Sequence, residues 1–509
     1  FRRVLFRSEQ LLSAMPLLTL LLLTPIIGAG WILVQRGKPQ RQRYAALFFS
    51  GLTLLIALYI LLQFNHDSSA LQFFESVVWN ARMGTSYAVG VDGISLPMVL
   101  LAALLVFVAI LASTAIQERA QSYYALILFL ESAMIGVFIA QDWALFYVFW
   151  ELTLIPLFFL IDRWGGQRRS MAALNFVLYT MGGSVFILIS LLVLFDAMPD
   201  HSFSMVAMAE TARTLPPSTQ LFLFLGFLVG FGVKMPIFPL HGWLPLAHVE
   251  APAPISILLS GILLKMGAYG LIRAASILPN AIAELQPLLM GLALFGLIYG
   301  GLLAWRQSDL KAMVAYSSVS HMGVVLFGIS TMNIAGLTGA LFQMVAHGLV
   351  AGALFLLIGL LYQRTHTRNI NDYRSLIDHA PRFTLFTTIA LFSAIGIPGT
   401  AGFIAEFHAI VGGFERWGWI TVLLSLGVMI SASYAIRTIS VLFTGPSSSR
   451  MAQVADLSRG ESSAAALLAL LILWLGFFPA SALQMMDRSI EGVVPATSVL
   501  ISISEVGSK

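Results

Sequence analysis

The sequence predicts an all-α polytopic membrane protein with about fourteen transmembrane helices. The chain has 509 residues, of which 58% are hydrophobic and only 10% are charged. Its mean hydropathy is +0.88, outside the range of soluble globular domains and typical of multi-pass membrane proteins. Apolar windows of about 20 residues, the length at which a helix crosses a bilayer, recur along the chain.

The apolar windows define the predicted spans in chain order. Each is long enough to cross about 30 Å of hydrocarbon as a helix. The segments between them are too short to bury a core of their own, so we expect no soluble domain. The spans fall near residues 15–35, 44–63, 94–113, 122–140, 143–161, 171–195, 219–238, 253–275, 284–305, 309–330, 334–362, 382–412, 418–443 and 462–480.

Residues 1–14, FRRVLFRSEQLLSA, resemble nothing that follows them. We interpret this segment as an upstream extension or an assembly artefact; the alternative is a signal peptide with the arginines as its basic region. The spans then divide the chain into N-terminal helices, two five-helix groups, a last helix and an extracytoplasmic tail. These are predicted at 15–121, 122–275, 284–443, 462–480 and 481–509.

Basic residues gather in alternate loops, which predicts the orientation of the chain. By the positive-inside rule these loops are cytoplasmic, and both termini are extracytoplasmic. The opposite loops 64–92 and 196–217 are poorer in positive charge. The net charge of +4 is explained by cytoplasmic loops and predicts no nucleic-acid partner. The basic positions include Arg36, Lys38, Arg41, Arg43, Arg119, Arg163, Arg168, Arg169, Arg306, Lys311, Arg364, Arg368, Arg374, Arg450 and Arg459.

Cysteine usage and motif content exclude several kinds of site. The chain contains 0 cysteines, so it holds no disulfide, no cysteine-ligated iron–sulfur cluster and no cysteine-based zinc site. No Gly-rich phosphate loop lies between a plausible strand and helix. His241 and His248 lie in a proline-rich break, and no His-x-x-x-His pair occurs on one helix. We therefore expect neither a cofactor nor a metal on this chain.

Two lysines lie deep in apolar spans. An ammonium at the bilayer centre costs about 2.5–3.5 kcal/mol on insertion scales, so such residues line wet or paired interiors. Lys234 is followed by Pro236 and Pro239, which interrupt its helix, whereas Lys265 lies in the unbroken run ILLSGILLKMGAYGLI. Broken helices at membrane depth face protein or water. The sequence predicts a hydrated polar axis through both lysines.

Glu151 is a carboxylate in the apolar segment ALFYVFWELTLIPLFFL. A lone buried carboxylate is protonated or paired, and Lys234 is the expected partner. One alternative is a static ion pair that only fastens two helices, although desolvation makes such a pair a poor fastener. We favour the interpretation in which Glu151 modulates the proton affinity of Lys234.

His321 and His347 lie in otherwise apolar helices. Histidine exchanges protons near neutral pH through two ring nitrogens. The alternative is a pair of core histidines with no role beyond packing. A polar neighbourhood suited to bound water favours the functional interpretation; it comprises Ser317, Ser318, Ser320 and Gln343.

Glu406 follows the break at Gly396 and Pro398 in the span 382–412. A proline-broken span with a charge thus occurs as the fourth helix of each five-helix group. Such pairs indicate two inverted repeats of a transporter core. Glu131 is a further buried carboxylate, which we rank lower. The candidate row of proton-transfer residues is Glu151, Lys234, Lys265, His321, His347 and Glu406.

At these residues the chain resembles the M-subunit family of bacterial NADH:quinone oxidoreductase, respiratory complex I, the counterpart of mitochondrial NADH dehydrogenase subunit 4. The resemblance runs from Met15 to the last span. It rests on VGVDGISLPMVLL, LFYVFWELTLIPLFFLIDRWGG, GVKMPIFPLHGWLP, LLKMGAYGLIR, SDLKAMVAYSSVSHMG and GIPGTAGFIAEF. One departure is Leu246, where the family commonly has an aspartate in Leu-Pro-Asp-Ala-His.

The resemblance implies a fold of fourteen helices with two inverted five-helix repeats in the bacterial inner membrane. It implies that Glu151 and Lys234 form the input half-channel, that Lys265 is the central relay and that Glu406 faces the output side. His321 and His347 become hydrated connectors. The implied partners are lipids and adjacent antiporter-like membrane subunits. NADH, FMN, iron–sulfur clusters and quinone are expected on other subunits.

Three functions follow as hypotheses. The first is proton translocation in complex I, driven by quinone reduction on other chains. The second is a proton-conducting subunit of a cation/proton antiporter, or of a related hydrogenase, photosynthetic-type dehydrogenase or carbon-uptake complex. The third is a membrane scaffold without a conducting path.

Overall fold

The computed structural model describes residues 16–35, 37–446, 451 and 454–494. The interpretation of residues 1–14 and most of the predicted C-terminal tail lie outside the described residues. Within them, thirteen helical segments are long and apolar enough to cross a membrane. One of these, Ala401–Phe443, contains two consecutive helices, and the shorter apolar helix Pro381–Ile395 precedes it. The polytopic α-helical class predicted from hydropathy is therefore confirmed.

The first three spans follow one another in chain order, with one long loop between the second and the third. This loop contains the only strands among the described residues. The helices are α2 (Leu17–Val34), α3 (Pro39–Gln63) and α4 (Ser95–Ala112). Between α3 and α4, β1 (Gln72–Asn80) and β2 (Thr85–Val91) form an antiparallel hairpin in which Val77 pairs with Tyr87. The sequence analysis did not predict this hairpin. Its β-branched and aromatic residues favour strands, which the search for long apolar windows could not detect.

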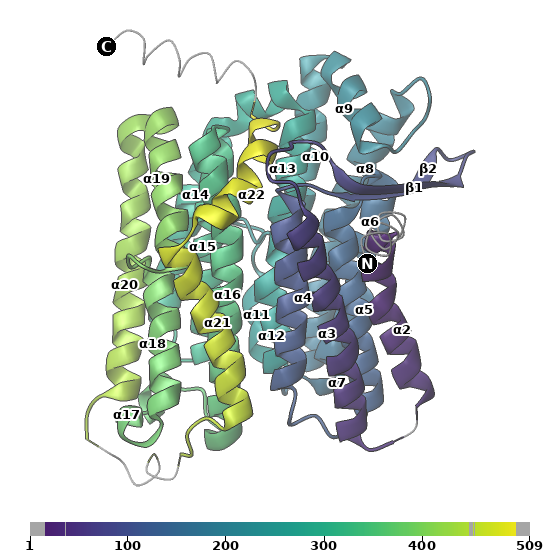
Figure 1. Ribbon diagram of the computed structural model, residues 1–509. Helices are drawn as coiled ribbons and strands as arrows, with labels where there is room; N and C mark the ends of the chain where they lie inside the picture. The colour runs from purple at the N-terminus through teal and green to yellow at the C-terminus, as the bar shows by residue number, and fades with distance from the viewer. Residues whose placement is uncertain (1–15, 36, 447–450, 452–453, 495–509) are drawn as a thin grey trace, which may run out of the picture.

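The first five-helix group contains the broken span at Lys234. Its proline-rich break separates α10 from the short helix α11, as Figure 1 shows. The elements are α5 (Ala120–Ile139), α6 (Trp143–Leu152), α7 (Leu154–Trp164), α8 (Arg169–Asp196), α9 (Met205–Thr214), α10 (Pro217–Lys234), α11 (Trp243–Glu250), α12 (Ala253–Leu258), the π-helix η1 (Leu259–Leu263) and α13 (Leu264–Ile277).

The second group contains the other break, where α18 ends before Gly396 and α19 begins at Ala401. Gly396 adopts φ +80°, a left-handed conformation that glycine reaches without strain. The inverted relation of the two groups stays a prediction. The elements are α14 (Pro279–Arg306), α15 (Leu310–Thr331), α16 (Ile334–Thr365), the 3₁₀-helix η2 (Ile370–Asp372), α17 (Leu376–His379), α18 (Pro381–Ile395), α19 (Ala401–Trp417), the 3₁₀-helix η3 (Gly418–Thr421) and α20 (Val422–Phe443).

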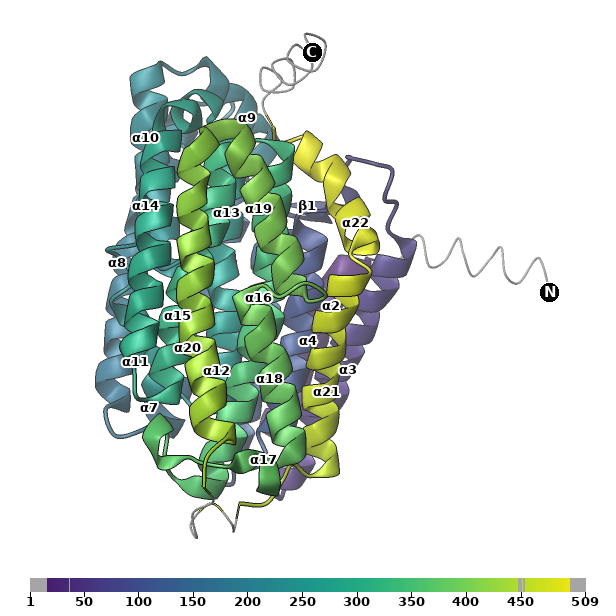
Figure 2. The same ribbon diagram turned by 90° about the vertical axis from the view of Figure 1, so that its left-hand side faces the viewer.

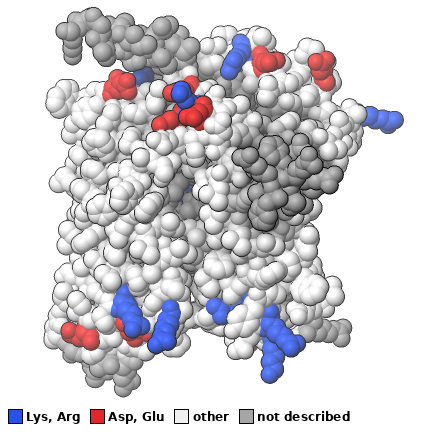
Figure 3. All heavy atoms as spheres, viewed as in Figure 1, with Lys and Arg blue, Asp and Glu red and all other residues white. Residues whose placement is uncertain are grey.

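Two further helices, α21 (Arg459–Phe477) and α22 (Ala480–Glu491), complete the described fold. Figure 2 shows α21 beside α18, with α22 leading to the end of the molecule that carries the hairpin and α9. In Figure 3 Lys and Arg side chains dominate the visible charge at the opposite end, with some Asp and Glu beside them, whereas Asp and Glu are more prominent at the hairpin end. This distribution supports the predicted cytoplasmic assignment of the lower end.

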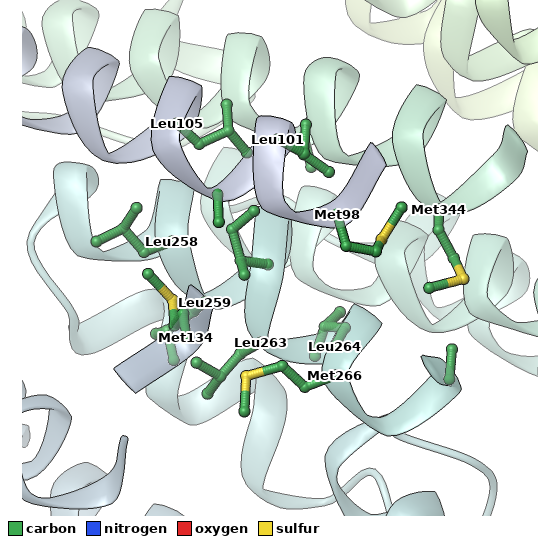
Figure 4. Close-up of a cluster of buried hydrophobic side chains, with 14 of the residues drawn as sticks. Met98, Leu101, Leu105, Met134, Leu258, Leu259, Leu263, Leu264, Met266 and Met344 are labelled. Carbon is green, nitrogen blue, oxygen red and sulfur yellow. The ribbon is translucent and has the colours of Figure 1, made fainter. Parts of the chain in front are cut away.

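Three spans form the enclosed centre of the molecule. Every residue in the most apolar window of Ala253–Ile277 is buried, and Leu310–Thr331 and Ile334–Thr365 are nearly as enclosed. Figure 4 shows the apolar packing around the first of these. The side chains come from α4, α5, α12, η1, α13 and α16 and include Met98, Leu101, Leu105, Met134, Leu258, Leu259, Leu263, Leu264, Met266 and Met344.

Candidate functional site

Lys234 is the last residue of α10 and is buried where the span breaks. Its Nζ donates a hydrogen bond of 3.0 Å to Thr153 Oγ1 and one of 3.4 Å to the carbonyl of Trp150. The same ammonium lies 3.9 Å from the centre of the Trp150 indole ring. Thr153 is the joint between α6 and α7. The neighbouring helix pair therefore solvates the charge that α10 brings into the membrane.

Glu151 lies on α6 between the two residues that hold Lys234, but the predicted direct ion pair is not formed. Among the described residues, no carboxylate oxygen comes within 4.0 Å of Lys234 Nζ. The reason is that Thr153 and the Trp150 carbonyl already satisfy the ammonium. Glu151 Oε1 is buried without a hydrogen-bond partner, and Tyr147 interacts with the carboxylate. Glu151 and Lys234 therefore make no direct contact.

Lys265 lies at the start of α13, directly after the π-helix η1. Lys265 Nζ donates to the carbonyl of Ser260, which lies within η1, at 2.5 Å. On the other side, Nζ lies 2.7 Å from Nδ1 of His347 on α16. The Ser260 hydroxyl also contacts the Ser318 hydroxyl at 2.9 Å. Polar groups from two central spans thus contact Lys265 directly, and Ser318 on the third span contacts Ser260.

His347 and His321 lie next to one another. Their ring centroids are 5.3 Å apart. His321 Nδ1 lies 3.3 Å from Gln343 Nε2, and His321 Nε2 lies 3.4 Å from the hydroxyl of Tyr434 on α20. Lys265, His347, His321 and Tyr434 therefore form one buried row that crosses four helices.

Glu406 is buried on α19, one helical turn beyond the break. Its carboxylate lies against Gly396, where any side chain would collide with it. Tyr434 is near enough to interact electrostatically with Glu406. Hydrogen bonds do not join Glu406 to Tyr434, or Lys234 to Lys265, within the described residues. The structure thus brings Lys265, His347 and His321 together. Lys234 and Glu151 lie at a second position, and Glu406 lies at a third.

Several polar residues at the site were not singled out from the sequence. Thr153 and Tyr434 carry hydroxyls that are common in apolar helices, and their contacts depend on tertiary packing. Lys311 was interpreted as a cytoplasmic loop residue because it begins a span. Instead it is buried, and its Nζ donates to the carbonyl of Ala251 at 2.6 Å. His248 is also buried, stacks on Phe355 and has no hydrogen-bond partner among the described residues.

Glu131 on α5 is fully buried, and both of its carboxylate oxygens lack a hydrogen-bond partner in the described part of the chain. It belongs to the helix that presents Met134 to the apolar cluster of Figure 4. The described residues contain no group of three or more His, Asp or Glu side chains placed to hold a metal ion.

Comparison with known proteins finds a matching family model and similar sequences. The family model described as "NADH:quinone oxidoreductase/Mrp antiporter, TM" matches residues 140–431. NADH-quinone oxidoreductase subunit M of Rickettsia conorii is 36% identical over 489 residues, covering 94% of this chain and 99% of the relative. NAD(P)H-quinone oxidoreductase chain 4 2 of Thermosynechococcus vestitus is 38% identical over 507 residues, covering 95% of this chain and 94% of the relative.

Solved structures give the same result. A chain of respiratory complex I from Thermus thermophilus superposes with a TM-score of 0.86 at 31% identity, covering 95% of this chain and 100% of that one. Sequence and fold agree over nearly the full length of both. The chain belongs to the M-subunit family of NADH:quinone oxidoreductase, the antiporter-like membrane subunits of respiratory complex I.

Proposed function

We propose that this chain translocates protons across the membrane as a subunit of a proton-pumping NADH:quinone oxidoreductase. The observation that carries the proposal is the row of Lys265, His347, His321 and Tyr434 in the most enclosed part of the molecule. A scaffold would gain nothing from titratable groups that are costly to hold in hydrocarbon. The contact between Lys265 and His347, at 2.7 Å, has the length that direct proton transfer requires, and bridging water would carry the proton on to His321 and Tyr434.

Lys234 and Glu151 provide the proton-loading side of this path. Lys234 is held by neutral acceptors, so its charge is compensated only from a distance by Glu151. A shift of the Glu151 carboxylate toward Lys234 favours the protonated lysine, and its withdrawal favours proton release. Water has to bridge from Lys234 to Lys265, because no side-chain contact joins them in the described residues. Glu406, at the second break, receives the proton from the row and passes it to the output side.

The electron transfer belongs to other subunits. The chain has 0 cysteines and no phosphate-binding loop, so NADH, FMN, iron–sulfur clusters and quinone are assigned to partner chains. Adjacent antiporter-like subunits and lipids are the expected contacts within the membrane. We place the chain in a bacterial inner membrane with both termini extracytoplasmic, because basic side chains line the opposite end.

The test uses the purified complex in proteoliposomes. Lys234→Ala and Glu151→Ala should each abolish coupled proton pumping while the complex still assembles. Electron transfer from NADH to an artificial acceptor that bypasses the membrane arm serves as the measure of assembled complex. Normal pumping by either variant would refute the assigned role.

A cation/proton antiporter subunit is the second candidate, because the matching family model covers both classes. Sodium-dependent transport without redox subunits in the purified complex would favour it. A scaffold predicts instead that Lys265→Leu leaves activity intact and raises stability, because it removes a buried charge.

A further inference from the structure

Beyond Glu406, α19 continues to the end of the molecule that we assign as extracytoplasmic. Arg416 follows Glu406 by ten residues on this helix, a rise of roughly 15 Å. Any proton that leaves Glu406 toward that side passes between α19 and the helices that face it. Figure 2 shows α14, α15 and α20 near α19 in this region.

A hydrogen-bond relay joins three of these helices at the outer end. Arg416 Nη2 donates to Gln286 Oε1 at 2.6 Å, and Gln286 Nε2 donates to the carbonyl of Thr331 at 3.2 Å. Gln286 on α14 is 5% exposed, whereas Arg416 lies at the surface. The guanidinium thus covers a buried amide that is bound in turn to the last residue of α15.

A buried hydroxyl without a hydrogen-bond partner among the described residues lies in η3, directly after α19. Thr421 Oγ1, in η3, is enclosed and makes no hydrogen bond in the described part of the chain. Thr421 and the buried Phe327 ring flank Gly413. Gly413 lies seven residues after Glu406, and two helical turns return to nearly the same helix face. The face that bears Glu406 therefore leads to Phe327 and to the methyl group of Thr421, the residue whose buried hydroxyl lacks a hydrogen-bond partner.

Arg416 brings an uncompensated charge to this position. Among the described residues, no carboxylate lies within ion-pairing distance of its guanidinium, which packs over the Trp417 ring at 5.1 Å. A fixed positive charge at the mouth of a narrow path repels cations that approach from outside. An arginine held by a neutral amide can leave it at a smaller cost than one held in an ion pair.

We propose that Arg416 and Gln286 form the extracytoplasmic gate of the output path that starts at Glu406. The inference rests on the proposed proton translocation. When Arg416 binds Gln286, the mouth is covered and the Phe327 ring keeps the segment below it dry. When the hydrogen bond opens, water reaches Thr421 and the proton leaves. The arginine charge opposes proton re-entry from the extracytoplasmic side.

The test compares Arg416→Gln, Gln286→Leu and the double variant in proteoliposomes of the intact complex. Passive proton leak is measured with an imposed pH difference and no NADH, and pumping is expressed per electron pair transferred. Each single variant should raise the leak several-fold and lower the pumping ratio. The double variant should leak no more than either single variant, because both remove the same contact. Arg213→Gln, an exposed arginine on α9, is the matched control and should behave like the unaltered complex.

The outcomes separate this gate from the proposed function. An unchanged leak and pumping ratio in both single variants would overturn the gate, as would lower amounts of complex with unchanged coupling, the sign of a purely structural contact. In an Arg416→Gln/Lys234→Ala variant the extra leak should vanish because the path is cut; a leak that persists would also overturn the gate. Normal pumping by Lys234→Ala alone would instead refute the proposed function.

Discussion

Lys265 Nζ and His347 Nδ1 lie 2.7 Å apart and join α13 to α16 at the buried centre of the molecule. A protonated lysine has only donors, so this contact requires an unprotonated Nδ1. The imidazole is then a proton acceptor from Lys265, and its other nitrogen is free to pass a proton toward His321.

We expect His347→Ala to interrupt the row. Removing a hydrogen bond to a charged group costs about 1.5–3 kcal/mol, so proton transfer from Lys265 should slow roughly tenfold or more. The measurement is proton pumping per electron pair in proteoliposomes. His66→Ala, at an exposed position after α3, is the control and should pump normally. Full pumping by the His347 variant would contradict a role for the row.

Thr153 should act as a positioning residue for Lys234. Thr153→Val keeps the shape but removes the acceptor 3.0 Å from Nζ, which costs about 1–3 kcal/mol for a buried charged donor. The lysine should hold its proton less well, and the pH profile of pumping should move to lower pH. Thr153→Ser should restore the profile. A threonine needed only for packing would show the reverse order, with valine tolerated better than serine.

The break before α19 should depend on Gly396. Gly396→Ala forces a left-handed conformation on a residue with a side chain, at about 1–2 kcal/mol, and adds a collision with the Glu406 carboxylate. Thermal unfolding in detergent should show lower stability, and pumping should fall because Glu406 is displaced. Gly291→Ala is the control, because its site on α14 has open space around it. That change should be neutral or stabilising by up to about 1 kcal/mol. Equal behaviour of the two variants would argue against a special role for the break.

Stability should depend on pH through Asp92, which lies in the loop before α4. Arg273 Nη2 lies 2.7 Å from Asp92 Oδ2. Burial is the largest influence and raises the pKa of Asp92, but attraction to Arg273 and hydrogen bonds from Ser95, Arg273 and Ile94 together outweigh it. The pKa therefore lies below its usual value.

A lowered native pKa means that the carboxylate stabilises the fold above its unfolded pKa, near about 4. This stabilisation is lost as pH falls through the lower native pKa. We expect Asp92→Asn to cost about 2 kcal/mol at neutral pH, less than the roughly 3–5 kcal/mol of a fully buried pair, because both side chains keep some exposure. The stability difference between Asp92→Asn and the unaltered protein should shrink at acidic pH. Thermal unfolding at neutral pH and at acidic pH measures it. Asp67→Asn, on the exposed loop after α3, should show no such dependence.

The spans could be predicted because their apolar windows match the hydrocarbon core of a bilayer. The charged residues could be predicted because a charge inside such a window is costly and therefore rare. Lys234, Lys265 and Glu406 are conspicuous in apolar windows, and the glycines and prolines beside two of them predict the breaks. Thr153 and Tyr434 gave no such signal, since a hydroxyl can be satisfied within its own helix. The missing contact between Glu151 and Lys234 reflects the same limit. Which acceptor an ammonium finds depends on how α6, α7 and α10 pack.

Lys311 shows a different limit of sequence reasoning. A lysine at the end of an apolar window resembles any loop lysine until the neighbouring helix is known to supply the carbonyl of Ala251. The hairpin of β1 and β2 was missed because hydropathy windows detect spans and pass over short amphipathic strands.

The span Ala253–Ile277 is enclosed by protein on every side, and this has a mechanical consequence. A helix that meets no lipid cannot slide or rotate alone, because α4, α5, α10 and α16 fill the space around it. Any displacement that separates Lys265 from His347 must therefore be concerted with its neighbours. We therefore expect a shift of any one of these neighbouring helices to alter the contact between Lys265 and His347, and with it the proton affinity of Lys265.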